Sequence, residues 1–199
     1  MTQSDLNKAY LDAVAYLDIE RALALLDAGA DPNALDTMGE GALASLCERW
    51  YPPPPQGSGI ATDAEGNARP TEAQITDMMR RLIARGADVN AHGPDGYGAQ
   101  GCSTLINAVL SAQADVVEFL LEHGADPNFN PWPDESPHVV SKALDYALCD
   151  ANLAETDEER EALERIIALL EAHGAILEVE EGEEASAADE RTQENLQKQ

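Results

Sequence analysis

The stretch STLINAVLSAQADVVEFLLEHGADPN, Ser103–Asn128, contains the pattern that decides the fold. Its apolar residues recur at the 3.6-residue period of two short amphipathic helices. The second helix ends at Gly124, where a left-handed conformation closes the helix and glycine adopts it without a Cβ penalty. Asp126 and Asn128 then follow, and both residue types hydrogen-bond nearby backbone in turns. The stretch therefore predicts a helix pair followed by a turn.

The same unit recurs along the chain. The end of the second helix and the turn return as LLDAGADPN (Leu25–Asn33), LIARGADVN (Leu82–Asn90) and LLEAHGAIL (Leu169–Leu177). Starts of first helices that match Ser103–Ala108 are found at Gly41–Leu46 and Lys142–Ala147. Self-similarity of this kind is the signature of a stacked repeat architecture.

These residues resemble the ankyrin-repeat family, whose units begin with Thr-Pro-Leu-His-x-Ala and end with Gly-Ala-Asp-x-Asn. The resemblance covers about residues 6–177 and is closest over Ser103–Asn128. It implies an all-α solenoid of helix pairs with finger loops, in about four repeats ending near Asn33, Asn90, Asn128 and Leu177. It also implies a concave face of first helices and fingers that binds other proteins. Apolar residues such as Leu82, Val117, Leu120 and Leu170 would form the shared core.

Departures from the pattern locate insertions, because Gly29, Gly86, Gly124 and Gly174 are spaced more widely than the family period of about 33 residues. One insertion, residues 51–70, contains four prolines followed by Gln-Gly-Ser-Gly, and we expect it to be loop, part of it polyproline-like. Residues 178–199 are acidic with few apolar side chains, which predicts a disordered tail. The chain thus divides into a repeat domain, residues 1–177, and this tail.

Composition restricts the partners. Thirty-eight acidic residues against 12 lysines and arginines give a net charge of −26. This charge disfavours direct nucleic-acid binding and anionic membrane surfaces, both of which need clustered cations. No apolar run approaches the roughly 20 residues of a membrane span. Residues 1–10 do not resemble a signal peptide, and the three separated cysteines fit a reducing, cytoplasmic setting.

The motifs that suggest chemistry fail in context. Gly96–Gly101 reads G-x-G-x-x-G, but no buried strand precedes it, so a lengthened finger explains it better than a nucleotide site. The histidines and cysteines lack metal-ligand spacing, and His123 and His173 each precede a helix-ending glycine. Asp63–Asn67 is only faintly similar to a calcium loop. We predict no cofactor, no metal, no catalytic residues and no enzymatic activity.

Arg80, Arg81 and Arg85, with Arg69 upstream, concentrate positive charge near one second helix. Two interpretations remain open. These arginines form a solvated helix face that pairs with neighbouring acids, or they contact the acidic tail or the Asp157–Glu159 stretch.

Candidate partner-binding residues are the acidic and aromatic side chains expected on fingers and first helices. They are Asp36, Glu40, Glu48, Asp95, Tyr97, Phe129, Trp132, Asp134, Glu135, Asp145 and Tyr146. Trp132 lies between two prolines that restrict its backbone. Either it anchors a partner, as tryptophans often do, or it folds back as local core.

Together these features favour a non-catalytic protein that captures a basic partner on an acidic surface. Small stand-alone ankyrin proteins of bacteria include immunity proteins that neutralise a toxin, and this chain is similar to them. The alternatives are a general adaptor or chaperone for a basic client, and a nucleotide-dependent regulator or enzyme using Gly96–Gly101.

Overall fold

The computed structural model describes residues 2–37, 39–47, 53–91, 103–130 and 142–177. These residues form eight helices and two short strands. The helices are α1 (Gln3–Ala15), α2 (Ile19–Asp27), α3 (Ala42–Ser45), α4 (Glu72–Ile83), α5 (Thr104–Leu110), α6 (Ala114–Glu122), α7 (Ala143–Leu153) and α8 (Asp157–Ala172). The strands are β1 (Ala61–Thr62) and β2 (Ala68–Arg69).

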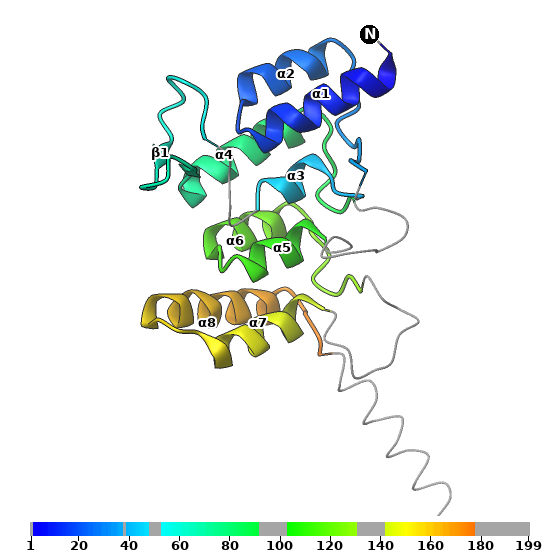
Figure 1. The fold of residues 1–199 in the computed structure, drawn as a ribbon. Coiled ribbons are helices and arrows are strands. Elements are labelled where there is room, and N and C mark those ends of the chain that lie inside the picture. The colour runs from blue at the N-terminus through cyan, green and yellow to red at the C-terminus, as the bar shows by residue number, and fades with distance from the viewer. Residues whose placement is uncertain (1, 38, 48–52, 92–102, 131–141, 178–199) are drawn as a thin grey trace, which may run out of the picture.

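The helices stack as four antiparallel pairs (Figure 1). The first helices of the pairs contact one another in the order α1, α3, α5, α7, and among the second helices α4 contacts α6 and α6 contacts α8. The turns that join α1 to α2, α5 to α6 and α7 to α8 lie along one edge of the stack, and the C-terminal ends of α2, α4 and α6 lie toward the opposite edge. This arrangement confirms the predicted all-α repeat solenoid.

The predicted helix ends are confirmed. Gly29, Gly86, Gly124 and Gly174 have φ values of +99°, +98°, +87° and +83°, in the left-handed region. At Gly124 the N–H bonds to the Leu121 carbonyl, and the N–H of Ala125 bonds to the Leu120 carbonyl. These two bonds satisfy carbonyls that the helix end would otherwise leave unpaired.

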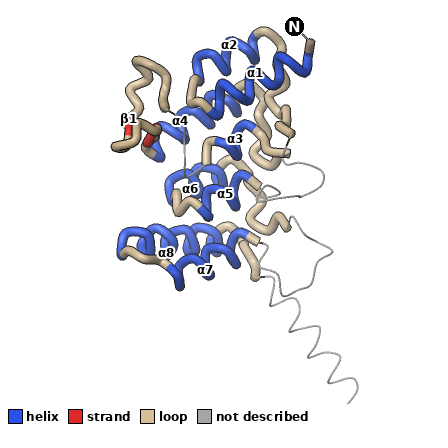
Figure 2. The backbone as a smooth tube through the Cα atoms, in the orientation of Figure 1, coloured by secondary structure: helices blue, strands red, loops and turns tan. Residues whose placement is uncertain are grey.

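The prediction that residues 51–70 form only loop is wrong for part of the segment. β1 and β2 pair antiparallel, Ala61 opposite Arg69 and Thr62 opposite Ala68, and form a hairpin beside α4 (Figure 2). Ile60 and Ala68 are buried in the common core, which gives the segment an apolar anchor. Each strand has only two residues, too few for an alternating pattern to predict a strand from the sequence.

One continuous core runs through all four pairs. Leu82, Val117, Leu120 and Leu170 are fully buried, as predicted. Tyr10 is also fully buried, and its hydroxyl donates to the Pro32 carbonyl at 3.4 Å. Burial raises the pKa of Tyr10, and the nearby Asp31 carboxylate adds to the shift. Among the described residues, no helix is both long and apolar enough to cross a membrane.

Ion pairs connect neighbouring helix pairs of the stack. Arg81 of α4 pairs with Glu20 of α2, and Arg85, just after α4, pairs with Asp27 at the end of α2. Arg69 instead pairs with Asp63 at 2.8 Å within the β-hairpin. For Arg69, Arg81 and Arg85 these contacts confirm the first interpretation, pairing with neighbouring acids, and Arg80 pairs with Asp77 of its own helix at 3.6 Å. The acidic tail lies outside the described residues.

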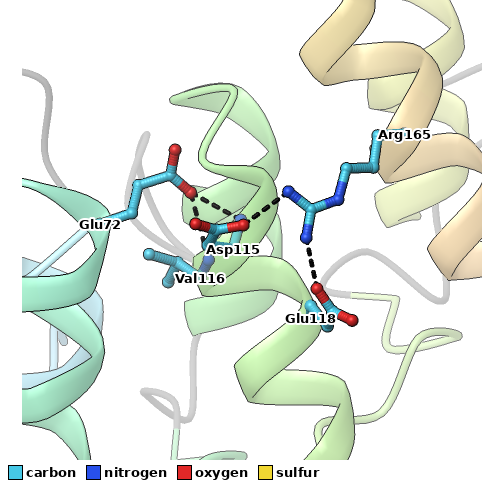
Figure 3. A network of polar contacts seen from close by, with 5 residues as sticks. All are labelled: Glu72, Asp115, Val116, Glu118 and Arg165. Carbon is cyan, nitrogen blue, oxygen red and sulfur yellow. Dashed lines mark hydrogen bonds and ion pairs between the residues drawn. The ribbon is translucent and has the colours of Figure 1, made fainter.

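A polar network continues this connection across three pairs (Figure 3). Glu72 of α4 accepts hydrogen bonds from the backbone N–H groups of Asp115, at 2.6 Å, and Val116, at 3.4 Å. Asp115 and Glu118, one turn apart on α6, both pair with Arg165 of α8. The N-cap residue of α6, Gln113, makes no side-chain cap bond. Glu72 therefore caps α6 from the preceding repeat.

Candidate functional site

A ladder of asparagine side chains sets the spacing of the fingers. Asn33 donates from Nδ2 to the Gly86 carbonyl at 3.1 Å and accepts at Oδ1 from the Asp88 N–H at 2.8 Å. Asn90 makes the same two bonds to the next turn, to Gly124 and Asp126, both at 2.9 Å. The side chain of each asparagine thus spans two repeats.

The ladder continues at both ends. Asn128 donates to the Gly174 carbonyl and accepts from the Ile176 N–H, both at 2.9 Å. At the first turn, the described residues include no asparagine of a preceding repeat, and two side chains of α1 each make one of the two equivalent bonds. Gln3 donates to the Gly29 carbonyl, and Asn7 accepts from the Asp31 N–H, both at 3.0 Å. The bases of the fingers are therefore fixed in one row.

The aspartate of each turn binds the backbone of the asparagine that follows it. Asp31, Asp88 and Asp126 each accept from the backbone N–H of the asparagine two residues on, at 2.9 Å. This Asx-type turn orients the asparagine toward the next repeat. The recurring Asp-x-Asn motif is thus one device, in which the aspartate shapes the turn and the asparagine joins the repeats.

Of the predicted partner-binding residues, Asp36 and Glu40 lie together in the first finger. An antiparallel bridge between Leu35 and Gly41 closes this finger. The Asp36 N–H donates to the Glu40 carbonyl, and the Glu40 N–H donates to Asp36 Oδ1, both at 2.9 Å. The Asp36 side chain remains exposed while it shapes the turn.

A hollow lies between this finger and α1. Leu35, Asp36 and Thr37 form one wall, and α1 forms the other with residues that include Lys8, Leu11 and Asp12; its volume is about 600 Å³. Lys8 pairs with Asp12 at 2.7 Å along the helix. The hollow therefore combines two leucines with carboxylates on both walls, a lining that can hold an apolar side chain next to a cationic one.

The remaining described candidates are less accessible. Phe129 and Tyr146 are half-buried and pack against the common core. Asp145 is only 8% exposed, and its Oδ2 accepts the Lys142 N–H at 3.3 Å at the start of α7. We therefore leave Asp145 out of the surface proposed below, because its carboxylate serves the helix start.

Other candidates fall on residues that the structure does not describe. They are Glu48, Asp95, Tyr97, Trp132, Asp134 and Glu135, and the Gly96–Gly101 motif and residues 178–199 also lie outside the described parts. The two interpretations of Trp132 stay open.

His123, His173 and the calcium-like loop have local roles. Nδ1 of His123 and His173 lies 2.7 and 2.8 Å from the carbonyl oxygens of Phe119 and Leu169, so each ring donates to the last turn of its helix. Asp63 accepts from the N–H groups of Asn67, at 2.8 Å, and Glu65, at 3.1 Å. Partial burial alone would raise the pKa of Asp63, but these bonds and Arg69 outweigh it and lower the pKa. Over the described residues, no three metal-ligating side chains gather.

Lys8, Leu11 and Asp12 were missed as surface residues in the sequence. They lie on α1, where the repeat motif is weakest, so no pattern marked them. The bridging role of Asn33, Asn90 and Asn128 also escaped the sequence analysis, although the threefold recurrence of Asp-x-Asn was the signal that could have shown it.

Comparisons with known proteins agree with this geometry. Residues 100–130 match the family model described as ankyrin repeat. The human 2-5A-dependent ribonuclease is 31% identical over 91 residues, a match that covers 44% of this chain and 12% of the ribonuclease. The chain thus matches only a small part of that protein's length. The stacked helix pairs, the left-handed glycines, the asparagine ladder and the family match show that the chain is an ankyrin-repeat protein, and its repeats indicate a protein–protein interaction module.

Proposed function

We propose that the chain is a non-catalytic binding protein that captures a basic partner protein on its finger edge and first helices. The observation that carries the proposal is the hollow between α1 and the first finger, where Asp12 and Asp36 flank Leu11 and Leu35. An apolar side chain with a neighbouring lysine or arginine matches this lining.

The net charge of −26 supports the same partner chemistry. An acidic surface accelerates encounter with a basic partner and repels acidic competitors, while buried apolar contacts supply most of the affinity. We propose that Asp95, Asp134 and Glu135, which lie outside the described residues, extend this field, and that Trp132 adds an anchor.

As the finer hypothesis, we propose that capture inhibits the partner, as an immunity protein inhibits a basic, nuclease-like toxin. Carboxylates can occupy a surface that the toxin uses for phosphates. The alternative, an adaptor or chaperone for a basic client, predicts binding with no loss of the partner's activity. An activity assay of the captured partner separates the two.

The test compares two opposite charges at one exposed position. Thr37 lines the hollow and carries no charge, so Thr37→Lys and Thr37→Glu change the field without removing the Asp36–Glu40 bonds. The partner is first obtained by affinity capture on the immobilised chain and identified by mass spectrometry. Association is then measured at two salt concentrations.

We expect Thr37→Lys to slow association about tenfold or more at low salt, and Thr37→Glu to leave it unchanged or faster. Glu164→Lys, at an exposed position of α8, is the matched control and should change association less than twofold. If Thr37→Lys and Glu164→Lys slow association equally, the hollow is not the recognition site.

A further inference from the structure

The fourth helix pair is longer than the third. α7 (Ala143–Leu153) and α8 (Asp157–Ala172) extend beyond α5 (Thr104–Leu110) and α6 (Ala114–Glu122) at the edge that carries the helix-to-helix turns (Figure 1). A cavity of about 580 Å³ lies there between the end of α5 and the α7–α8 connection. We call it the overhang groove.

The floor of the overhang groove is apolar. Val109 and Leu163, both buried in the common core, lie at its base, and Leu110 continues the apolar lining. Leu153 stands at its rim and is 72% exposed, the most exposed large apolar side chain that the described residues contain. Covering an exposed leucine with another apolar side chain removes its surface from water and is favourable.

The rim of the groove is acidic. Asp150, Glu155 and Glu159 line it, and no lysine or arginine is among the described residues that do so. Arg160 follows Glu159, but its guanidinium pairs with Asp157 and donates to the Ala154 carbonyl. The groove thus presents carboxylates above an aliphatic floor.

We propose that the overhang groove is a second docking site, separate from the finger edge, for a segment of a partner protein that carries an aliphatic side chain beside a lysine or arginine. The aliphatic group would pack on Val109 and Leu163 between Leu110 and Leu153. The cation would lie against the carboxylates of Asp150, Glu155 and Glu159. The volume of the overhang groove falls within the range of about 300–1,000 Å³ typical of sites that enclose a ligand.

The charge of the chain argues for a partner as the occupant. A second copy of this chain would bring a net charge of −26 to an acidic rim. The acidic segment 178–199 of the same chain would meet the same repulsion. A cationic, partly apolar segment has the opposite charge and matches both the rim and the floor.

The experiment uses the full chain and a fluorescein-labelled amphipathic peptide of leucine and lysine as the probe. Fluorescence anisotropy gives its Kd for the wild type and four variants. Leu153→Ser and Glu155→Lys alter exposed residues of the groove. Tyr16→Ser, at another exposed large side chain next to a helix end, and Glu158→Lys, three residues from Glu155 and not lining the groove, are the matched controls.

We expect Leu153→Ser and Glu155→Lys each to raise Kd about fivefold or more, and both controls to change it less than twofold. A peptide with serine in place of leucine should bind at least tenfold more weakly. Thr37→Lys in the finger hollow should leave peptide binding unchanged, so this test is independent of the function proposed above.

Four results would each overturn the proposal. Glu158→Lys could weaken binding as much as Glu155→Lys, which would reduce the effect to net charge. The serine peptide could bind as tightly as the leucine peptide. Thr37→Lys could weaken peptide binding as much as the groove variants. Sedimentation velocity could show a dimer of the chain that Leu153→Ser dissociates, which would make a second copy the occupant.

Discussion

The side-chain amide of Asn90 holds the backbone of Gly124, 34 residues further along the chain, through an Nδ2–oxygen distance of 2.9 Å. The same side chain accepts the Asp126 N–H, so one residue satisfies a donor and an acceptor of the next repeat. Gly124 ends α6 in the left-handed conformation. Asn90 therefore joins two repeats by binding the backbone at the end of α6, where the chain of the following repeat turns.

Asn90→Ala should destabilise the chain by about 1–2 kcal/mol. The substitution removes two neutral hydrogen bonds, each of which contributes about 0.5–1.5 kcal/mol, and the site is exposed, so water replaces part of the loss. Urea unfolding followed by circular dichroism measures the difference. Asn152→Ala is the matched control, because among the described residues Asn152 makes a local bond, to the Leu148 carbonyl within its own helix. Equal losses in the two variants would contradict a role for Asn90 between repeats.

Glu72→Ala should cost about 1 kcal/mol, because it removes the side chain that caps α6. Thermal or urea unfolding measures this loss. Gln113→Ser, added to Glu72→Ala, should restore most of the stability, because serine at the N-cap position can accept from the same backbone N–H groups.

Arg165→Met provides the comparison for the same network. Arg165 is about half exposed, with a side-chain exposure of 48%, and exposed ion pairs contribute between about 0 and 1 kcal/mol. The loss of stability in Arg165→Met should be smaller than that in Glu72→Ala and should shrink further in high salt. A Glu72→Ala variant that gains nothing from Gln113→Ser would show that Glu72 acts by something other than capping.

Much of the fold could be predicted because its determinants are local and repeated. Gly124 and its counterparts had to end helices, and Asp126 and Asn128 had to form a turn, whatever surrounded them. The contacts that depend on two distant segments could not be predicted in this way. The capping of α6 by Glu72 joins residues 43 apart across a boundary between repeats, and nothing near either residue signals it.

The candidate site was predictable only in part. Asp36, which lines the hollow, was a candidate because an acidic finger is visible in the sequence, whereas Lys8, Leu11 and Asp12 belong to the first helix, whose pattern is the least regular. Asp145 stays a prediction as a partner residue, and its carboxylate also accepts the Lys142 N–H at the start of α7, a capping role that its position in the sequence allowed. The β-hairpin of β1 and β2 was missed because only four residues form its strands.

Asp63 predicts an acid-dependent contribution of the β-hairpin to stability. Because its pKa in the folded chain is lowered from 3.8, its ionised form is favoured by folding. This contribution is complete above the unfolded pKa, near 4, and is lost as pH falls through the lower folded pKa. Asp63→Asn removes it at every pH. The stability advantage of the wild type over Asp63→Asn should therefore be constant between about pH 5 and 7 and shrink below pH 4.

Urea midpoints of the wild type and Asp63→Asn at several pH values measure this difference. Because both proteins contain the other carboxylates, the titration of those groups cancels in the comparison. Asp77→Asn is a control, since Asp77 lies on α4 and pairs with Arg80 at 3.6 Å on the exposed surface. An advantage over Asp63→Asn that grows as the pH falls below 4 would contradict the assignment.

Two helix ends lack the glycine that their conformation favours, and they give the last prediction. Ala112 follows α5 with a φ of +52°, and Leu17 follows α1 with a φ of +58°. At Ala112 the N–H bonds to the Val109 carbonyl, and the next N–H, that of Gln113, bonds to the Ala108 carbonyl. This is the same closing motif as at Gly124, but it holds a side chain in the left-handed region, which costs about 1–2 kcal/mol.

Ala112→Gly should therefore stabilise the chain by about 0.5–1 kcal/mol, because the relief of strain exceeds the added entropy of the unfolded chain, about 0.4–1 kcal/mol. Leu17→Gly relieves the same strain but removes a side chain that is only 3% exposed, so it should destabilise by about 2 kcal/mol or more. Differential scanning calorimetry of both variants checks the pair. A loss of stability in Ala112→Gly would show that the methyl group of Ala112 contributes more by packing than its conformation costs.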